Sequence, residues 1–241
     1  MAHSIDWNNI EIGPRGMVWF TFILLLAIYG VIFRLYFPTP SGRFGSDYSY
    51  MMPAWLDGAI WFRNNGFEIP WFTPSFCAGQ PFFADPQSTY YSIPQLLNLV
   101  MDPLNSAFTT LLLSASVMFW GAYLLMRKVF ESSMLVAVFV GAVLMFNGFL
   151  PHRILVGHIA YHGFALTPLI AMLLLMPIRQ RINNVAAAMF AGILLAYWVQ
   201  SGFGTLILAG ALAIFLVALT FALIGGSIKQ FFVRGTISGI V

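Results

Sequence analysis

Long apolar runs separated by short polar segments form the main pattern of the chain. The first run covers Met17–Phe37, and five more follow at Leu104–Met126, Met134–Leu150, Ile159–Pro177, Val185–Val199 and Thr205–Ile224. A helix needs about 20 apolar residues to cross the hydrocarbon core of a bilayer. The pattern therefore predicts an all-α fold, a polytopic transmembrane helical bundle with about six spans. Polar and glycine residues at 200–204 predict a tight turn between the last two spans.

Composition supports this class and excludes others. Of the 241 residues, 60% are hydrophobic and only 8% are charged, whereas a soluble domain carries about 25% charged residues. The single cysteine, Cys77, excludes an intramolecular disulfide and a Cys-rich metal site. The net charge is +3 without a stripe of Lys and Arg, so nucleic acid is not expected as a partner.

The basic residues of the loops predict the orientation. With a cytoplasmic N-terminus, the inner segments hold seven Lys and Arg: Arg15, Arg127, Lys128, Arg179, Arg181, Lys229 and Arg234. The outer segments hold three: Arg43, Arg63 and Arg153. Because cytoplasmic loops carry the excess of Lys and Arg, we expect a multi-pass protein of the cell's inner (plasma) membrane with its N-terminus inside.

The chain as a whole, 1–241, reads as a single transmembrane domain. After Phe231–Arg234, the residues Gly235–Val241 resemble the beginning of a seventh span. A span that stops after seven residues leaves carbonyl groups unsatisfied in lipid. We therefore expect the N-terminal part of a longer protein, and the alternative is a tail at the membrane interface.

A long outer loop, 38–103, lies between the first two spans. It holds nine of the 13 prolines and five of the eight acidic residues and is dense in aromatic residues. Such a loop is expected to fold onto the membrane surface, since aromatic rings prefer the headgroup layer. Within this loop, we expect the residues Ala54–Asn65 to form a short interfacial helix.

Two acidic residues of this loop are candidates for chemistry. Asp47, in Gly45–Tyr48, could act as a general base toward a hydroxyl, or it could simply cap the segment that follows. Asp85 precedes Pro86, which is typical of a turn, but its carboxylate could instead orient a sugar or a divalent cation. These two carboxylates indicate no cofactor other than such a divalent cation.

A second cluster holds three of the four histidines and lies on the same outer side: His152, Arg153, His158 and His162. On a helix, His158 and His162 would be at i and i+4 and share a face. That pair could hold a metal or a haem. With Arg153 it could instead bind a phosphate, or these residues could mark a hydrated helix end.

The order of these parts resembles the GT-C superfamily of polytopic glycosyltransferases, and most closely the bacterial YfhO-like membrane proteins. The resemblance spans about Met17–Pro177 and rests on five short motifs: Gly45–Tyr48, Cys77–Gln87, Tyr90–Pro94, Gly157–His158 and Phe164–Leu169. It implies transfer of a sugar from a polyprenyl-phosphate donor at the outer face of the membrane. It implies Asp47 as the catalytic base, Asp85 as a second acidic residue, and Arg153, His158 and His162 near the donor phosphate.

A different class remains open on the residues alone. The chain could be a non-catalytic integral-membrane subunit of a larger complex, with the aromatic loop as its interface to partner membrane subunits. A transporter is a third alternative. The partners expected in the enzymatic interpretation are membrane lipids and a lipid-linked sugar donor.

Overall fold

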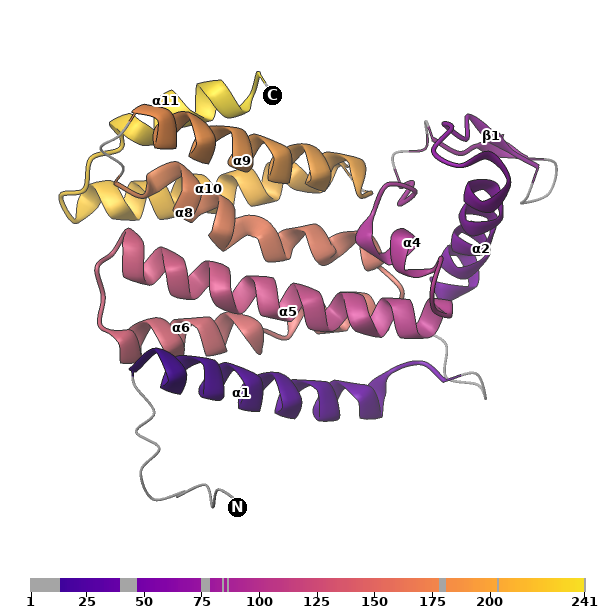
Figure 1. Ribbon diagram of the computed structural model, residues 1–241, viewed down its shortest axis with the longest axis horizontal. Coiled ribbons are helices and arrows are strands. Elements are labelled where there is room, and N and C mark those ends of the chain that lie inside the picture. Colours follow the sequence, from indigo (N-terminus) through magenta and orange to yellow (C-terminus); the bar gives the residue numbers. More distant parts are fainter. Residues whose placement is uncertain are drawn as a thin grey trace, which may run out of the picture.

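The computed structural model describes residues 14–39, 47–74, 79–83, 85, 87–177, 181–202 and 204–240 (Figure 1). Most of them are helical, and the helices of the bundle run along one common axis. The elements in chain order are α1 (Pro14–Tyr36), α2 (Tyr48–Asn65), β1 (Phe72–Thr73), β2 (Gln80–Pro81), α4 (Ile93–Leu97), α5 (Pro103–Lys128), α6 (Met134–Met145), α7 (Phe149–Leu155), η2 (Ile159–Leu166), α8 (Thr167–Leu175), α9 (Arg181–Gln200), η3 (Gly204–Leu206), α10 (Ile207–Leu223) and α11 (Lys229–Ser238).

Four helical segments of the described chain are long and apolar enough to cross a membrane. They are Pro14–Tyr36, Pro103–Lys128, Met134–Leu155 and Ile182–Gln200. Two shorter apolar segments, Ile159–Leu175 and Ile207–Leu223, correspond to the other two predicted spans. The described chain is therefore an all-α bundle, and these helices have the length and apolar composition of membrane-spanning segments. The turn predicted between the last two spans is present, because α9 ends at Gln200 and α10 begins at Ile207.

The third predicted span is broken near its C-terminal end. Helix α6 stops at Met145, and α7 begins at Phe149 after an interruption at Asn147. The Asn147 side-chain oxygen accepts hydrogen bonds from the backbone N–H groups of Phe149 and Leu150, at 3.1 and 3.2 Å. Asparagine is a strong cap because its oxygen replaces missing intrahelical acceptors. This cap redirects the chain into α7 and thereby positions the residues that follow it.

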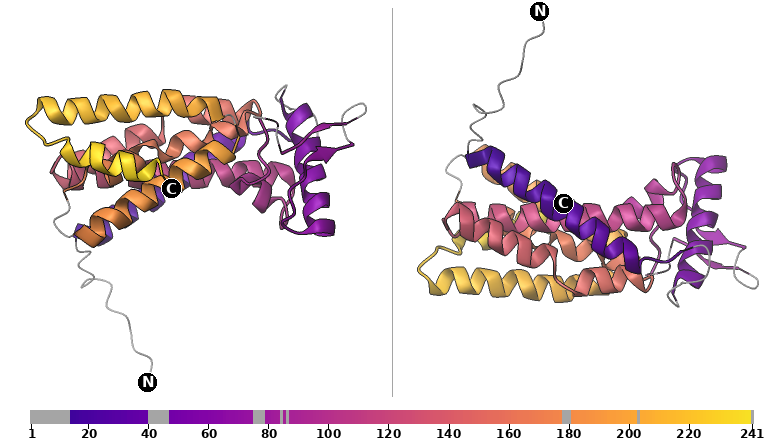
Figure 2. Two further views of the ribbon diagram at one scale, coloured as in Figure 1. Left: turned by 90° about the horizontal axis from the view of Figure 1, so that it is seen from above. Right: turned by 90° about the horizontal axis from the view of Figure 1, so that it is seen from below.

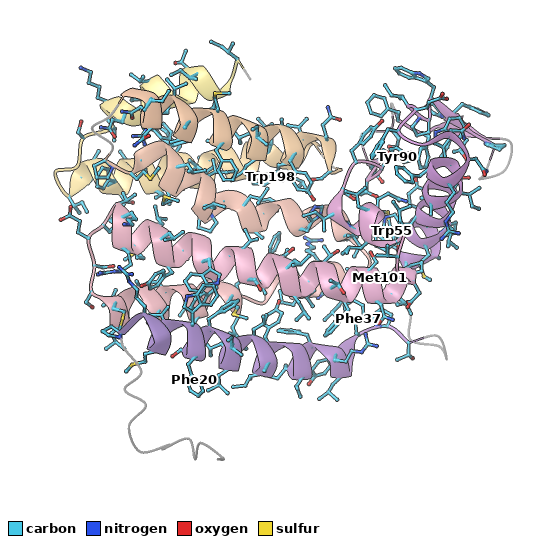
Figure 3. All side chains as sticks on the ribbon, in the orientation of Figure 1. Phe20, Phe37, Trp55, Tyr90, Met101 and Trp198 are labelled. Carbon is cyan, nitrogen blue, oxygen red and sulfur yellow. The ribbon has the colours of Figure 1, made fainter. Side chains whose placement is uncertain are left out.

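Helix α5 is the centre of the bundle and packs against α1, α6, α8 and η2. Around Leu104–Phe119 of α5, a buried apolar cluster joins it to α1 and α2, with Tyr29, Phe37 and Trp55 almost fully buried. A second cluster joins α8, α9 and α10 around the buried indole of Trp198 (Figure 3). The indole fits because Gly210 faces it; a Cβ there would lie 1.9 Å from the ring.

The long loop is folded at one end of the bundle in its described part. Helix α2 runs across the bundle axis there, as the two views of Figure 2 show. It begins at Tyr48, six residues earlier than the interfacial helix predicted at Ala54. Trp55 fixes it to the loop: its indole N–H donates to Thr89 Oγ1 at 2.9 Å, and its carbonyl accepts from Gln95 Nε2 at 3.0 Å.

The segment that resembled a seventh span forms α11, which packs against α9 and α8. Helices α11 and α9 run in the same direction, because Arg234 bonds Asn184 and Ser238 bonds the carbonyl of Ala188. Ser238 is buried in this contact. The described part of the tail thus joins the bundle as a helix.

Candidate functional site

Asp47 lies directly before α2, in the N-cap position, but its side chain makes no cap hydrogen bond. Its Oδ2 instead contacts His158 Nε2, on the segment between α7 and η2. The carboxylate is about half exposed, with 46% of its side-chain surface accessible. The structure thus places Asp47 at the capping position that the sequence suggested, while its carboxylate serves a contact far away in the chain.

His158 connects this carboxylate to a cation. Its Nδ1 lies 3.2 Å from Nη1 of Arg153. Because a guanidinium can only donate hydrogen bonds, Nδ1 must accept and the ring proton must lie on Nε2, facing Asp47. In this arrangement His158 donates to the carboxylate and accepts from the guanidinium. Three of the five residues singled out from the sequence form one continuous chain: Asp47, His158 and Arg153.

Backbone packing holds the two halves of this chain together. The Asp47 N–H donates to the carbonyl of Val156 at 3.3 Å, and the Tyr48 hydroxyl donates to the carbonyl of Ile154 at 2.7 Å. Gly157, in the turn between Val156 and His158, has a φ of +101°. A Cβ at Gly157 would lie 2.6 Å from the Tyr48 nitrogen. The close approach of α2 to this turn therefore requires glycine, both for its φ and for its missing side chain.

Arg153 lies among aromatic rings. Its guanidinium carbon is 4.8 Å from the ring centre of Tyr161 and 5.5 Å from that of Phe149. Such rings attract a cation through their negative faces. Its Nε is buried and has no hydrogen-bond acceptor among the described residues. The site therefore holds a fixed cation with a donor group that is not satisfied within the described part of the chain.

Asp85 forms a turn, as its place before proline suggested. Its Oδ1 accepts from the Gln87 N–H at 2.8 Å, and its Oδ2 accepts from the Tyr50 hydroxyl at 3.2 Å. It lines a cavity of about 20 Å³ together with Gln80 and Gln95, which is room for about one water molecule. Tyr50 lies about one turn after Asp47 in α2, so the two carboxylates flank the same helix start. A sugar- or cation-orienting role for Asp85 stays a prediction.

His162 is separate from this cluster. The sequence interpretation placed His158 and His162 on one helix face, but the segment is a 3₁₀ helix that begins after His158. In a 3₁₀ helix, residues three apart are aligned, not four. His162 is buried, with its ring nitrogens near the Ile159 carbonyl at 2.8 Å and the Tyr197 hydroxyl at 2.6 Å. The shared-face prediction was wrong, while donor binding by His162 stays a prediction.

The Tyr197 hydroxyl also accepts from the Ile93 N–H at 3.1 Å. It thereby links η2 and α9 to α4 of the loop. Tyr197 and Tyr50 were not identified from the sequence, since neither lies beside a charged motif. Gly157 could have been identified from the sequence, because it is the glycine of the Gly157–His158 motif.

No group of three or more His, Cys, Asp or Glu residues that could hold a metal ion occurs within the described residues. Cys77 and the neighbours of Asp85 at positions 84 and 86 lie outside them. The arrangement that is present combines a half-exposed carboxylate, an imidazole and a partly buried guanidinium. Chemically, it can accept a proton at one end and bind an anion at the other.

The chain was also compared with known proteins. No protein-family model matches it, and neither a curated protein nor a solved structure matches it.

Proposed function

We propose that the chain is a membrane glycosyltransferase of the GT-C type, which moves a sugar from a polyprenyl-phosphate donor to an acceptor hydroxyl. The observation that supports this is the continuous contact from Asp47 through His158 to Arg153. Transfer of a sugar from a lipid phosphate needs a base for the acceptor and a cation for the leaving phosphate. The cluster supplies both groups within one hydrogen-bonded chain.

In this proposal the acceptor oxygen attacks the anomeric carbon of the donor. A C–O bond forms to the acceptor, the bond from the anomeric carbon to the phosphate oxygen breaks, and the polyprenyl phosphate leaves with the bonding electrons. Asp47 takes the proton of the acceptor hydroxyl. Arg153 contacts the departing phosphate, for which a guanidinium offers bidentate hydrogen bonds. His158 is a positioning residue, because its Nε2–H aims the carboxylate.

The proposal includes a topology. The two shorter apolar segments complete six spans, since 17 residues measure about 25 Å along a helix. With the N-terminus inside, α2 and the His158 turn lie at the outer face of a bacterial inner membrane. The helix α2 then lies along the membrane plane, consistent with its course across the bundle axis (Figure 2). Asp85 and His162 would bind substrate after a rearrangement of the loop.

The test uses the full chain in lipid nanodiscs with polyprenyl-phosphate mannose and polyprenyl-phosphate glucose as donor probes. Release of polyprenyl phosphate is measured for the wild type and for Asp47→Asn. Removing a catalytic base costs about 10²–10⁴ in rate, so Asp47→Asn should lose transfer by that factor. Glu68→Gln is the matched control for charge, because Glu68 is exposed in the same outer segment.

Asp57 is a poorer control, since its carboxylate accepts a hydrogen bond from Thr73. Wild-type transfer by Asp47→Asn would overturn the catalytic assignment and leave Asp47 as a helix-start residue. Absence of transfer by the wild type with every donor of this class would instead favour the non-catalytic membrane subunit.

A further inference from the structure

A groove between α9 and α11 lies at the end of the bundle opposite α2, where α5 also ends and α11 begins (Figure 1). It has a volume of about 570 Å³. Its polar lining consists of Lys229 and Arg234, which are basic, and Asn184 and Gln230, which are neutral amides. No acidic residue of the described chain lines it. The groove therefore carries positive charge without a lining carboxylate.

Arg234 is the unusual member, because it is only 1% exposed. Its Nη1 donates to the Leu173 carbonyl at 2.8 Å, and its Nη2 donates to Asn184 at 2.6 Å and to Gln230 at 2.9 Å. All three acceptors are neutral. Within the described part of the chain, no carboxylate forms an ion pair with Arg234 or Lys229. A buried charge is normally paired, and here the partial negative charge at the end of α8 compensates only in part.

The remaining lining of the groove is apolar and consists of Val185, Val233 and Ile237. Lys229 begins α11, and Ile237 lies about two turns further along the helix. Lys229, the exposed cation, thus lies at the end of the bundle, whereas Val233, the buried Arg234 and Ile237 follow further along α11. The order of the exposed cation and the apolar residues matches the order of headgroup and acyl chain in a membrane lipid.

We propose that this groove binds one anionic phospholipid, with its phosphate against the exposed Lys229, attracted also by the buried charge of Arg234, and with an acyl chain along Val185, Val233 and Ile237. Basic pockets between membrane helices are suited to anionic headgroups. The choice of an anionic lipid rests on the two cations of the lining and on the absence of acidic residues among the described residues there. The inference is independent of the proposed transferase function, because it involves none of the residues of the Asp47 site.

The test measures lipid binding to the purified full chain in nanodiscs of phosphatidylcholine with increasing phosphatidylglycerol. A photoactivatable phosphatidylglycerol reports occupancy, and mass spectrometry locates the crosslink. The wild type should retain phosphatidylglycerol over phosphatidylcholine, with the crosslink on α9 or α11. Lys229→Gln should weaken binding about fivefold, the change that corresponds to about 1 kcal/mol for one basic residue at an anionic surface.

Two further variants distinguish lipid binding in the groove from a general effect of surface charge. Lys128→Gln removes a lysine from the exposed end of α5, outside the groove, and should bind like the wild type. Val233→Trp fills the apolar part from an exposed position and should abolish crosslinking. Arg234 is left unchanged because its loss would disturb α8, α9 and α11 together.

Four outcomes would overturn the proposal. Equal weakening of binding by Lys128→Gln and Lys229→Gln would show a general effect of surface charge. Equal retention of the two lipids would exclude recognition of an anionic headgroup. Crosslinking from the groove to a second copy of the chain would show that another protein chain occupies it. Undiminished lipid crosslinking in Val233→Trp would exclude the groove as the binding site.

Discussion

The imidazole of His158 holds the carboxylate of Asp47 at the start of α2, where a capping side chain would otherwise bond its own helix. The Arg153 guanidinium fixes the histidine tautomer from the other side. A carboxylate committed to its own helix would have its oxygens engaged by backbone N–H groups. Here the capping function is given up, and the carboxylate stays about half exposed.

Gly157→Ala tests whether this arrangement depends on the close approach of α2. The new Cβ would lie 2.6 Å from the Tyr48 nitrogen, at a φ of +101°. We expect a loss of about 1–3 kcal/mol in the free energy of unfolding, because the strain is local to this turn. Gly148→Ala is the control, since a Cβ there meets nothing within 4 Å. Thermal unfolding in detergent measures both, and equal midpoints would contradict the packing argument.

Arg153→Gln tests the phosphate contact. In the proposed mechanism the guanidinium binds the donor phosphate, so its loss should raise KM for the polyprenyl-phosphate donor by about tenfold or more. Arg63→Gln is the matched control, because Arg63 is exposed on α2. Steady-state transfer rates at varied donor concentration measure the effect. An unchanged KM with Arg153→Gln would remove this residue from the donor site.

The sequence predicted the helices well because long apolar runs have few alternatives in a membrane. It also predicted that Asp47, Arg153 and His158 lie on one side of the membrane, but not that His158 would contact both of the others. That contact depends on the break at Asn147, which redirects the chain into α7. The 3₁₀ geometry after His158 was likewise not predictable from spacing, since the same residues would share a face in an α-helix.

The burial of Arg234 could not be predicted from the sequence, for a different reason. By composition, an arginine near the end of an apolar run is expected to reach the membrane surface. It is buried because Leu173, Asn184 and Gln230 supply acceptors from three helices. Such a set is visible only when α8, α9 and α11 are placed side by side.

Asp102 gives a pH-dependent prediction. It caps α5, and the hydrogen bond from the Asn105 N–H lowers the pKa of its carboxyl. A lowered pKa in the folded state means that its stabilisation is present above the unfolded-state pKa and is lost as pH falls through the folded-state pKa. Asp102→Asn keeps a capping oxygen but does not titrate.

The wild type should therefore unfold at a higher temperature than Asp102→Asn at pH 7, and this advantage should disappear as the pH falls below about 4. Thermal unfolding as a function of pH measures it. An advantage that persists unchanged to a pH of about 2 would argue against the cap as its source.

The orientation can be tested by labelling in a Cys77→Ser background. Glu68 and Asn183 are both exposed. Glu68 follows α2, Asn183 belongs to the first turn of α9, and α2 and the start of α9 lie at opposite ends of the bundle (Figure 1). With the N-terminus inside, an impermeant thiol reagent should label Glu68→Cys in intact cells and should label Asn183→Cys only after permeabilisation. The expectation follows from the excess of Lys and Arg in the inner loops. The reverse labelling pattern would invert the topology and place the Asp47 site in the cytoplasm.

The central claim, that Asp47 and His158 act as one unit in sugar transfer, is tested most directly by a double-mutant cycle. Transfer rates are measured for the wild type, Asp47→Asn, His158→Gln and the double variant with the same polyprenyl-phosphate donor. Residues that act together have non-additive effects. We predict that each single variant is slower than the wild type and that the double variant is no slower than Asp47→Asn alone. A double variant slowed by the product of the two factors, or His158→Gln at the wild-type rate, would contradict the account.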